Sequence, residues 1–107
     1  MSYDYAVEVV NVVDGDTVDL RVDLGFYMTA ALRFRVLAVD TPERGMRGFT
    51  EATEFTRAWL AQHTNLRART FRADSFGRWL ADIYDADTGA YLSEALLVAK
   101  MGVPYVR

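Results

Sequence analysis

Cysteine is absent from this 107-residue sequence, and histidine and lysine occur once each. The lack of cysteine excludes disulfides, zinc–thiolate sites and cysteine nucleophiles. The single histidine, His63, excludes mechanisms that need a histidine pair, and we expect it near a helix end with no catalytic task. No apolar run approaches the roughly 20 residues of a membrane helix. The N-terminus has no basic segment followed by an apolar run, so no signal peptide is visible and an intracellular protein is favoured.

The charge is unevenly distributed along the chain, which is long enough for one domain, residues 1–107, with one core. The net charge of −3 argues weakly against a general polyanion binder. Residues 1–43 carry a net −5, residues 44–78 a net +4 and residues 79–107 a net −2. Eleven of the twelve basic residues are arginine, whose planar fork suits phosphate. Genome base composition is an equally open explanation for this preference.

Residue patterns predict three strands in the first part of the chain. Tyr5–Val13 is rich in valine, and in Thr17–Asp23 apolar residues alternate with charged ones. The segment Thr29–Val39 returns with the same alternation, which places Arg35 on the polar face of the strand. The intervening Asp14–Asp16 segment, with its central glycine, is a turn signal.

Helical spacing begins near Thr50, which we expect to cap the helix. Ala52, Phe55, Ala58 and Trp59 then fall on one stripe, which is typical of a helix that packs on a core.

The remaining segments complete the predicted fold. Strands are expected over Leu66–Ala73 and Trp79–Tyr84, followed by a helix over Glu94–Met101 that Ser93 caps and Gly102 ends. Three strands, a helix, two strands and a helix are the order of an OB-fold, a mixed β-barrel of five strands with helices. Fold alone does not establish function.

Three acidic residues are expected to gather at one end of this barrel. Asp14 and Asp16 flank a glycine, and Asp40 follows an apolar strand. Neighbouring carboxylates repel one another, so such a cluster favours a cation. Oxygen ligands suit calcium or magnesium, and a backbone carbonyl from Thr41 would favour calcium. The alternative is that Asp14 and Asp16 only form a tight turn; the spacing excludes an EF-hand.

Two arginines and a glutamate extend this hypothesis. Arg35 leads to Asp40, Arg78 follows a turn glycine, and Glu43 lies just beyond Asp40. Each arginine alone reads as a solvated surface residue or a weak ion pair. Beside a bound cation, the two would form a phosphate clamp that offsets charge developing on a phosphoryl group. Glu43 would then position or deprotonate a water.

Aromatic residues offer a possible surface for nucleobases. Phe76 and Tyr105 are candidates for base stacking, with core packing as the open alternative. Trp59 and Trp79 are both expected in the core.

Four blocks in this sequence resemble the staphylococcal nuclease, or thermonuclease-like, family: VVDGDTVDL, LRFRVLAVDTPE, DSFGRWLADIY and SEALLVAKMGVPYV. They come in the family's order and cover most of the chain from Val12 to Val106. The resemblance implies calcium-dependent cleavage of DNA or RNA on an OB-fold barrel, with expulsion of the 5′ oxygen and 3′-phosphate products. The carried-over calcium site consists of Asp16, Asp40 and the Thr41 carbonyl, with Asp14 beside it.

The resemblance also assigns the remaining roles. Arg35 and Arg78 match the two phosphate-binding arginines, and Glu43 matches the residue that activates or orients the attacking water. Phe76 and Tyr105 match two aromatic positions beside the nucleotide.

The sequence departs from the family in two segments. The loop Arg44–Gly48 is short and lacks lysines, so Arg44 and Arg47 are candidates to hold substrate in their place. The chain ends soon after Tyr105, where the family has a third helix. Either a smaller core suffices, or a partner chain, such as a second copy in a homodimer, covers the exposed face.

Three functions therefore remain as hypotheses. The first is a calcium-dependent nuclease that acts on DNA, RNA or both. The second is a non-catalytic OB module that binds nucleic acid or a protein partner. The third is a structural domain that interacts through the face left without a third helix.

Overall fold

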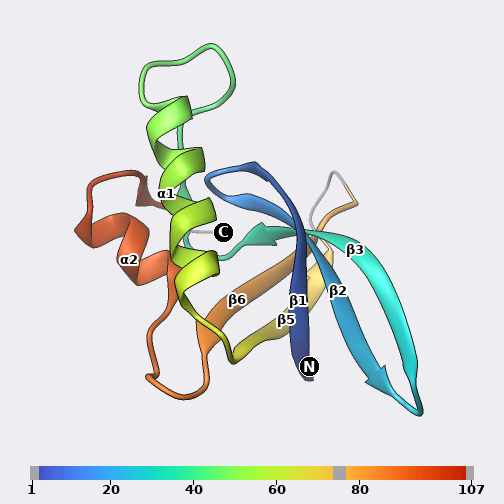
Figure 1. Cartoon of the computed structure of the whole chain (residues 1–107). Coiled ribbons are helices and arrows are strands. Elements are labelled where there is room, and N and C mark those ends of the chain that lie inside the picture. The colour runs from blue at the N-terminus through green and yellow to red at the C-terminus, as the bar shows by residue number, and fades with distance from the viewer. Residues whose placement is uncertain (1–2, 74–76, 106–107) are drawn as a thin grey trace.

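This chain forms a closed five-stranded β-barrel with two helices, as the residue pattern predicts (Figure 1). The computed structural model describes residues 3–73 and 77–105. The strand order around the barrel is β1-β2-β3-β6-β5, with β3 and β6 parallel and the other pairs antiparallel. The elements are β1 Tyr3–Asp14, β2 Thr17–Gly25, β3 Met28–Val36, β4 Val39–Asp40, α1 Phe49–Gln62, β5 Leu66–Ala73, β6 Trp79–Asp85, α2 Leu92–Val98 and β7 Val103–Pro104.

The barrel core follows the period-two alternation of β2. Val18, Leu20 and Val22 are buried on one face. Antiparallel register with β3 places Val18 opposite Phe34, which is also buried. Burial of aliphatic and aromatic side chains on one face of each strand is the main force that closes such a barrel.

The two helices close one side of the barrel (Figure 1). Trp59 and Leu60 of α1 and Leu92 and Leu96 of α2 join the buried cluster, which confirms the prediction for Trp59. Neither described helix is long and apolar enough to cross a membrane.

Helix ends differ from the predicted positions. The N-cap of α1 is Gly48, in a left-handed conformation, so the expectation for Thr50 is wrong. The N-cap of α2 is Tyr91 in place of Ser93. That helix ends at Val98 because Lys100 adopts a positive φ of 60°, which an α-helix does not accommodate.

The predicted strand Thr29–Val39 is interrupted. β3 ends at Val36, Leu37 and Ala38 turn the chain, and Ala38 has a φ of 70°. The chain then forms β4, which pairs with β7 outside the barrel. This break decides where Asp40 lies.

Trp79 is 43% exposed, so its predicted place in the core is wrong. It shares a strand face with the buried Ala81 and Ile83. However, it is the first residue of β6 and lies at the end of the barrel, where fewer layers of side chains cover it.

Candidate active site

One guanidinium nitrogen joins the acidic residues of two distant segments. Arg35 Nη2 lies 3.3 Å from Asp16 Oδ2 and 3.2 Å from Asp40 Oδ1. Asp16 belongs to the β1–β2 turn, Arg35 to β3 and Asp40 to β4. We call these three residues the acid–arginine cluster.

Arg35 is buried within this cluster, with only 5% of its surface exposed. Its Nη1 donates hydrogen bonds of 2.7 Å to the carbonyl oxygens of both Val36 and Val39. The expectation of a solvated arginine on the polar face is therefore wrong. The turn after β3 folds these carbonyls over the face that alternation alone would leave in water.

Asp16 is fixed by neighbours on both carboxylate oxygens. Its Oδ2 accepts a hydrogen bond of 2.8 Å from the Thr41 backbone N–H. Its Oδ1 accepts one of 3.1 Å from the Thr17 hydroxyl. A carboxylate with an ion pair and two hydrogen bonds holds one orientation, which a binding site requires.

The turn that carries Asp16 is attached to α1. Thr56 donates a hydrogen bond of 2.7 Å from its buried hydroxyl to the carbonyl of Gly15. A Cβ placed on Gly15 would lie 2.9 Å from atoms of Thr41 and Ala52, so only glycine allows this approach. The helix thus sets the position of the turn relative to β4.

Asp14 contributes charge beside this turn. Its Oδ1 accepts a hydrogen bond of 3.1 Å from the Asp16 backbone N–H. Burial, followed by the neighbouring Asp16 carboxylate, raises the pKa of Asp14 to about 6. Negative charge therefore accumulates here at neutral pH, where a nearby cation would stabilise it.

The cluster offers a partial set of ligands for a hard cation. Asp16 and Asp40 supply carboxylate oxygens, and the half-exposed Asp40 side chain leaves room for water ligands. The hydroxyl of Thr41 is buried and has no hydrogen-bond partner in the described part of the chain. These oxygens suit calcium. Because Arg35 already lies against both carboxylates, a bound ion would share them with the guanidinium.

Asp14, Asp16 and Asp40 do not form the three-carboxylate group that the sequence suggests. Within residues 3–73 and 77–105, no three His, Cys, Asp or Glu side chains are arranged to hold a metal ion. A calcium ion at the cluster would therefore depend on backbone carbonyl and water oxygens for most of its ligands.

Tyr105 lies beside the cluster. The Arg35 Cζ atom is 5.6 Å from the centre of its ring, and the Tyr105 backbone N–H donates a hydrogen bond of 3.0 Å to the Ala38 carbonyl. The β4–β7 pairing thus brings the C-terminal segment to the arginine. The ring remains 40% exposed, so it can contact a ligand.

The remaining predicted residues that the structure describes lie just before a strand and in the loop before α1. Arg78 immediately precedes β6, two positions before Leu80, the register partner of Arg35. Glu43 is exposed in the loop between β4 and α1, and its carboxylate has no ion pair with a described residue. Phe76 lies outside the described residues.

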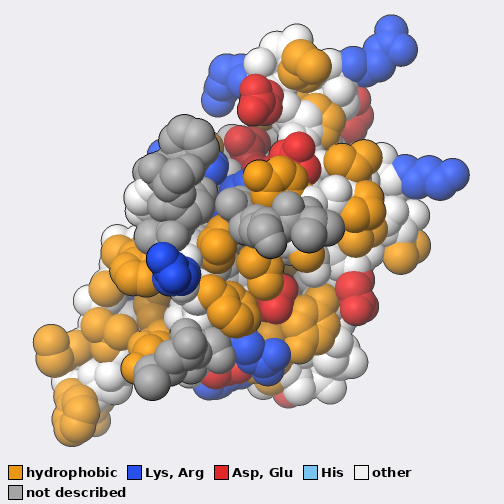
Figure 2. Space-filling view, turned by 180° about the vertical axis from the view of Figure 1, so that it is seen from behind, with side chains coloured by type: hydrophobic (Ala, Val, Ile, Leu, Met, Phe, Trp, Pro, Cys, Tyr) orange, Lys and Arg blue, Asp and Glu red, His pale blue; other side chains and the backbone are white. Residues whose placement is uncertain are grey.

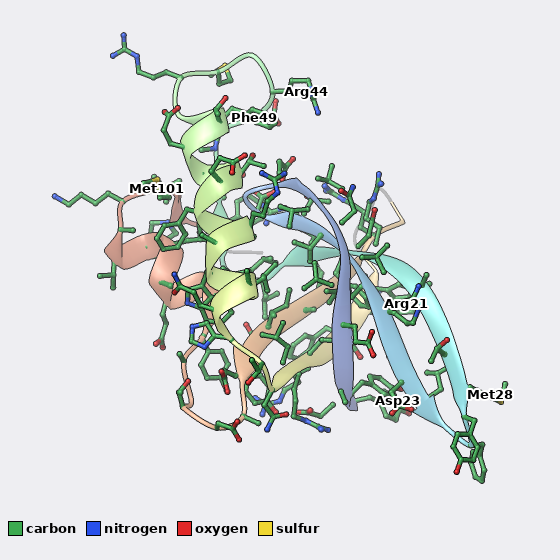
Figure 3. The ribbon with its side chains drawn as sticks, in the orientation of Figure 1. Arg21, Asp23, Met28, Arg44, Phe49 and Met101 are labelled. Atoms are coloured by element: carbon green, nitrogen blue, oxygen red, sulfur yellow. The ribbon has the colours of Figure 1, made fainter. Side chains whose placement is uncertain are left out.

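A hollow beside the cluster brings in a cation that sequence reasoning missed. It measures about 310 Å³, and its lining includes Asp40, Thr41, Arg47 and Lys100. Lys100 is the only lysine of the chain, and this was the only feature of the sequence that could have pointed to it as a site residue. Arg44, the other candidate of the short loop, instead lies over the Phe49 ring, with Cζ 5.2 Å from its centre (Figure 3).

No known protein-family model matches the sequence. Assignment to the nuclease family therefore stays a prediction based on the motifs.

Proposed function

We propose that this protein is a calcium-dependent nuclease that hydrolyses phosphodiester bonds of DNA, RNA or both and leaves 3′-phosphate ends. The observation that carries the proposal is the convergence of Asp16 and Asp40 on one nitrogen of Arg35. Carboxylate oxygens that could hold a cation therefore lie against a guanidinium that could donate to phosphate.

Asp16, Asp40 and the Thr41 carbonyl would hold the calcium ion. When bound, the ion supplies a positive charge that polarises a phosphoryl oxygen. Arg35, which is rigidly held by two backbone carbonyls, would donate to the phosphate and offset charge that develops during attack.

The remaining residues would handle the water and the substrate. Glu43 takes a proton from the attacking water as its oxygen bonds to phosphorus. The bond to the 5′ oxygen breaks, and that oxygen takes a proton from solvent. Arg78 provides the second guanidinium, while Tyr105 and Phe76 are proposed to stack on the nucleotide.

A second function is favoured by the same ion pairs. Arg35 itself forms ion pairs with both Asp16 and Asp40, as an arginine does in a purely structural cluster. In that case the chain is a non-catalytic OB module that binds nucleic acid or a protein partner.

Cleavage of single-stranded DNA distinguishes the two functions. We expect degradation in calcium, none in EDTA, and a loss of orders of magnitude in Glu43→Ser. Glu51→Ser is the matched control, because Glu51 is also exposed but lies in the first turn of α1. DNA binding without cleavage at any calcium concentration would support the non-catalytic module.

The C-terminal face is proposed as a second interaction surface. Val98 and Val103 are both exposed there. We propose a homodimer that covers this face.

A further inference from the structure

The hairpin formed by β2 and β3 carries an apolar tip far from the acid–arginine cluster. It projects beyond the rest of the barrel in Figure 1, and its end forms a hydrophobic extremity in Figure 2. Four of the five residues Leu24–Met28, which we call the hairpin tip, are large and apolar, and all four are exposed. Phe26 is 93% exposed and Tyr27 is fully exposed.

The backbone of the tip is unfavourable for these residues. Phe26 has a φ of 56° and Tyr27 a φ of 59°, so both lie in the left-handed region. Two-residue hairpin turns of this kind favour Asn-Gly, because bulky side chains are strained there. Neither turn geometry nor packing within the described chain explains why aromatic residues occupy these two turn positions. Strained and exposed aromatic residues point to a contact with another molecule.

A hollow that could receive such a tip lies between the hairpin and β1. It measures about 330 Å³, and Val7 and Thr29 contribute to its lining together with Glu8, Arg21 and Asp23. Arg21 and Asp23 lie along the hairpin while Met28 lies at its far end (Figure 3). Tyr27 of the tip also contributes to the lining, so the hollow and the tip lie next to each other on the same face.

The charge of this region disfavours nucleic acid and anionic lipid as partners. Residues 3–33 contain six acidic residues and two arginines. Arg33 is paired with Asp19 at 2.8 Å, whereas Arg21 is only 3.9 Å from Glu8 and is half-exposed. Arg21 therefore remains available to an acidic group that arrives with a partner.

We propose that two copies of this chain associate through their hairpins, each tip entering the hollow of the other copy. Two-fold symmetry makes such an interface self-complementary. The acidic Asp23 at the base of each entering tip would meet Arg21 of the other copy. The same set of contacts, made by the apolar tip and by one charge pair, would then occur twice in the dimer.

A turn substitution tests this proposal without damaging the fold. Phe26→Asn combined with Tyr27→Gly supplies the preferred turn sequence, so the variant should unfold at a higher temperature than the wild type. By sedimentation velocity from low-micromolar to submillimolar protein, we expect reversible dimers for the wild type. The variant should bind itself at least about tenfold more weakly. Arg21→Glu should also weaken the dimer, because it places a negative charge opposite Asp23.

Val10→Ser is the control, since Val10 is also apolar and exposed but lies outside the hairpin tip and the proposed C-terminal face. It should leave dimerisation unchanged. A wild type that stays monomeric at every concentration would overturn the proposal. So would a dimer that survives the turn substitution, or one that only Val10→Ser disrupts. Binding of a monomeric wild type to vesicles of a neutral phospholipid would instead assign the tip to a lipid surface and equally overturn it.

Discussion

The guanidinium of Arg35 and the carboxylate of Asp16 form a buried ion pair of 3.3 Å at the end of the barrel. Each side chain is less than one-tenth exposed. A charge in such an environment is costly without its partner. Loss of either partner would therefore leave an unpaired buried charge beside the proposed site.

Arg35→Met should lower the free energy of unfolding by about 3–5 kcal/mol, because it leaves the buried Asp16 without its partner. Urea denaturation measures this loss. Arg33→Met is the matched control on the same strand: Arg33 also pairs with a carboxylate at 2.8 Å but is half-exposed. Its substitution should cost clearly less, because an exposed ion pair contributes little to stability. Equal losses in the two variants would show that burial of Arg35 has no energetic role.

Gly15→Ala should destabilise the protein by about 1–3 kcal/mol through overpacking. The added Cβ would lie 2.9 Å from Ala52 Cβ and from Thr41 Cγ2 and Oγ1. Thr41→Ser removes the Cγ2 methyl group, so the double variant should recover part of the loss in thermal denaturation. A double variant with fully additive losses would contradict this steric account.

Thr56→Val should cost about 1–2 kcal/mol, because it leaves the Gly15 carbonyl without the hydroxyl that donates to it. Thr53→Val provides the comparison in the same helix. The Thr53 hydroxyl donates to the Phe49 carbonyl, which lies within α1. The loss in urea denaturation should be clearly smaller for Thr53→Val, and the opposite order would argue against α1 as the support of the turn.

The lowered pKa of Asp85 predicts a specific dependence of the free energy of unfolding on pH. The hydrogen bond with His63 lowers the pKa of Asp85, and backbone N–H groups of Asp87 and Thr88 add to this effect. Because the folded state lowers this pKa, the stabilisation is present above the unfolded value of about 3.9 and is lost as pH falls through the folded value.

Asp85→Asn should therefore be less stable than the wild type at neutral pH, and the difference should shrink in acid. Urea denaturation between neutral pH and pH of about 3 follows this change. Asp87→Asn, which alters an exposed carboxylate, should show a smaller difference at neutral pH. A constant gap between Asp85→Asn and the wild type would contradict the assigned pKa shift.

Local patterns predicted much of the fold. The bounds of β5 are as predicted, and the alternation in β2 identifies the residues that are buried. These signals arise from each strand's own two faces, so they can be recognised without knowledge of the partner strands.

The sequence could not predict the burial of Arg35. Alternation with Phe34 assigns it to the polar face, and nothing in the apolar run after it signals the left-handed Ala38. The turn there depends on pairing between β4 and β7, which are distant in sequence. The approach of Asp16 to Asp40 is likewise a tertiary contact. It was expected only because strand pairing in an OB-fold, and the resemblance to a known family, would bring these residues to one end of the barrel.

Calcium titration of the metal-free protein, followed by calorimetry or by amide chemical shifts, tests the central claim most directly. We predict saturable binding of calcium to the wild type, loss of that binding in Asp40→Asn, and retention in Asp87→Asn. No binding at millimolar calcium, or equal binding by the wild type and Asp40→Asn, would contradict a calcium site at Asp16 and Asp40.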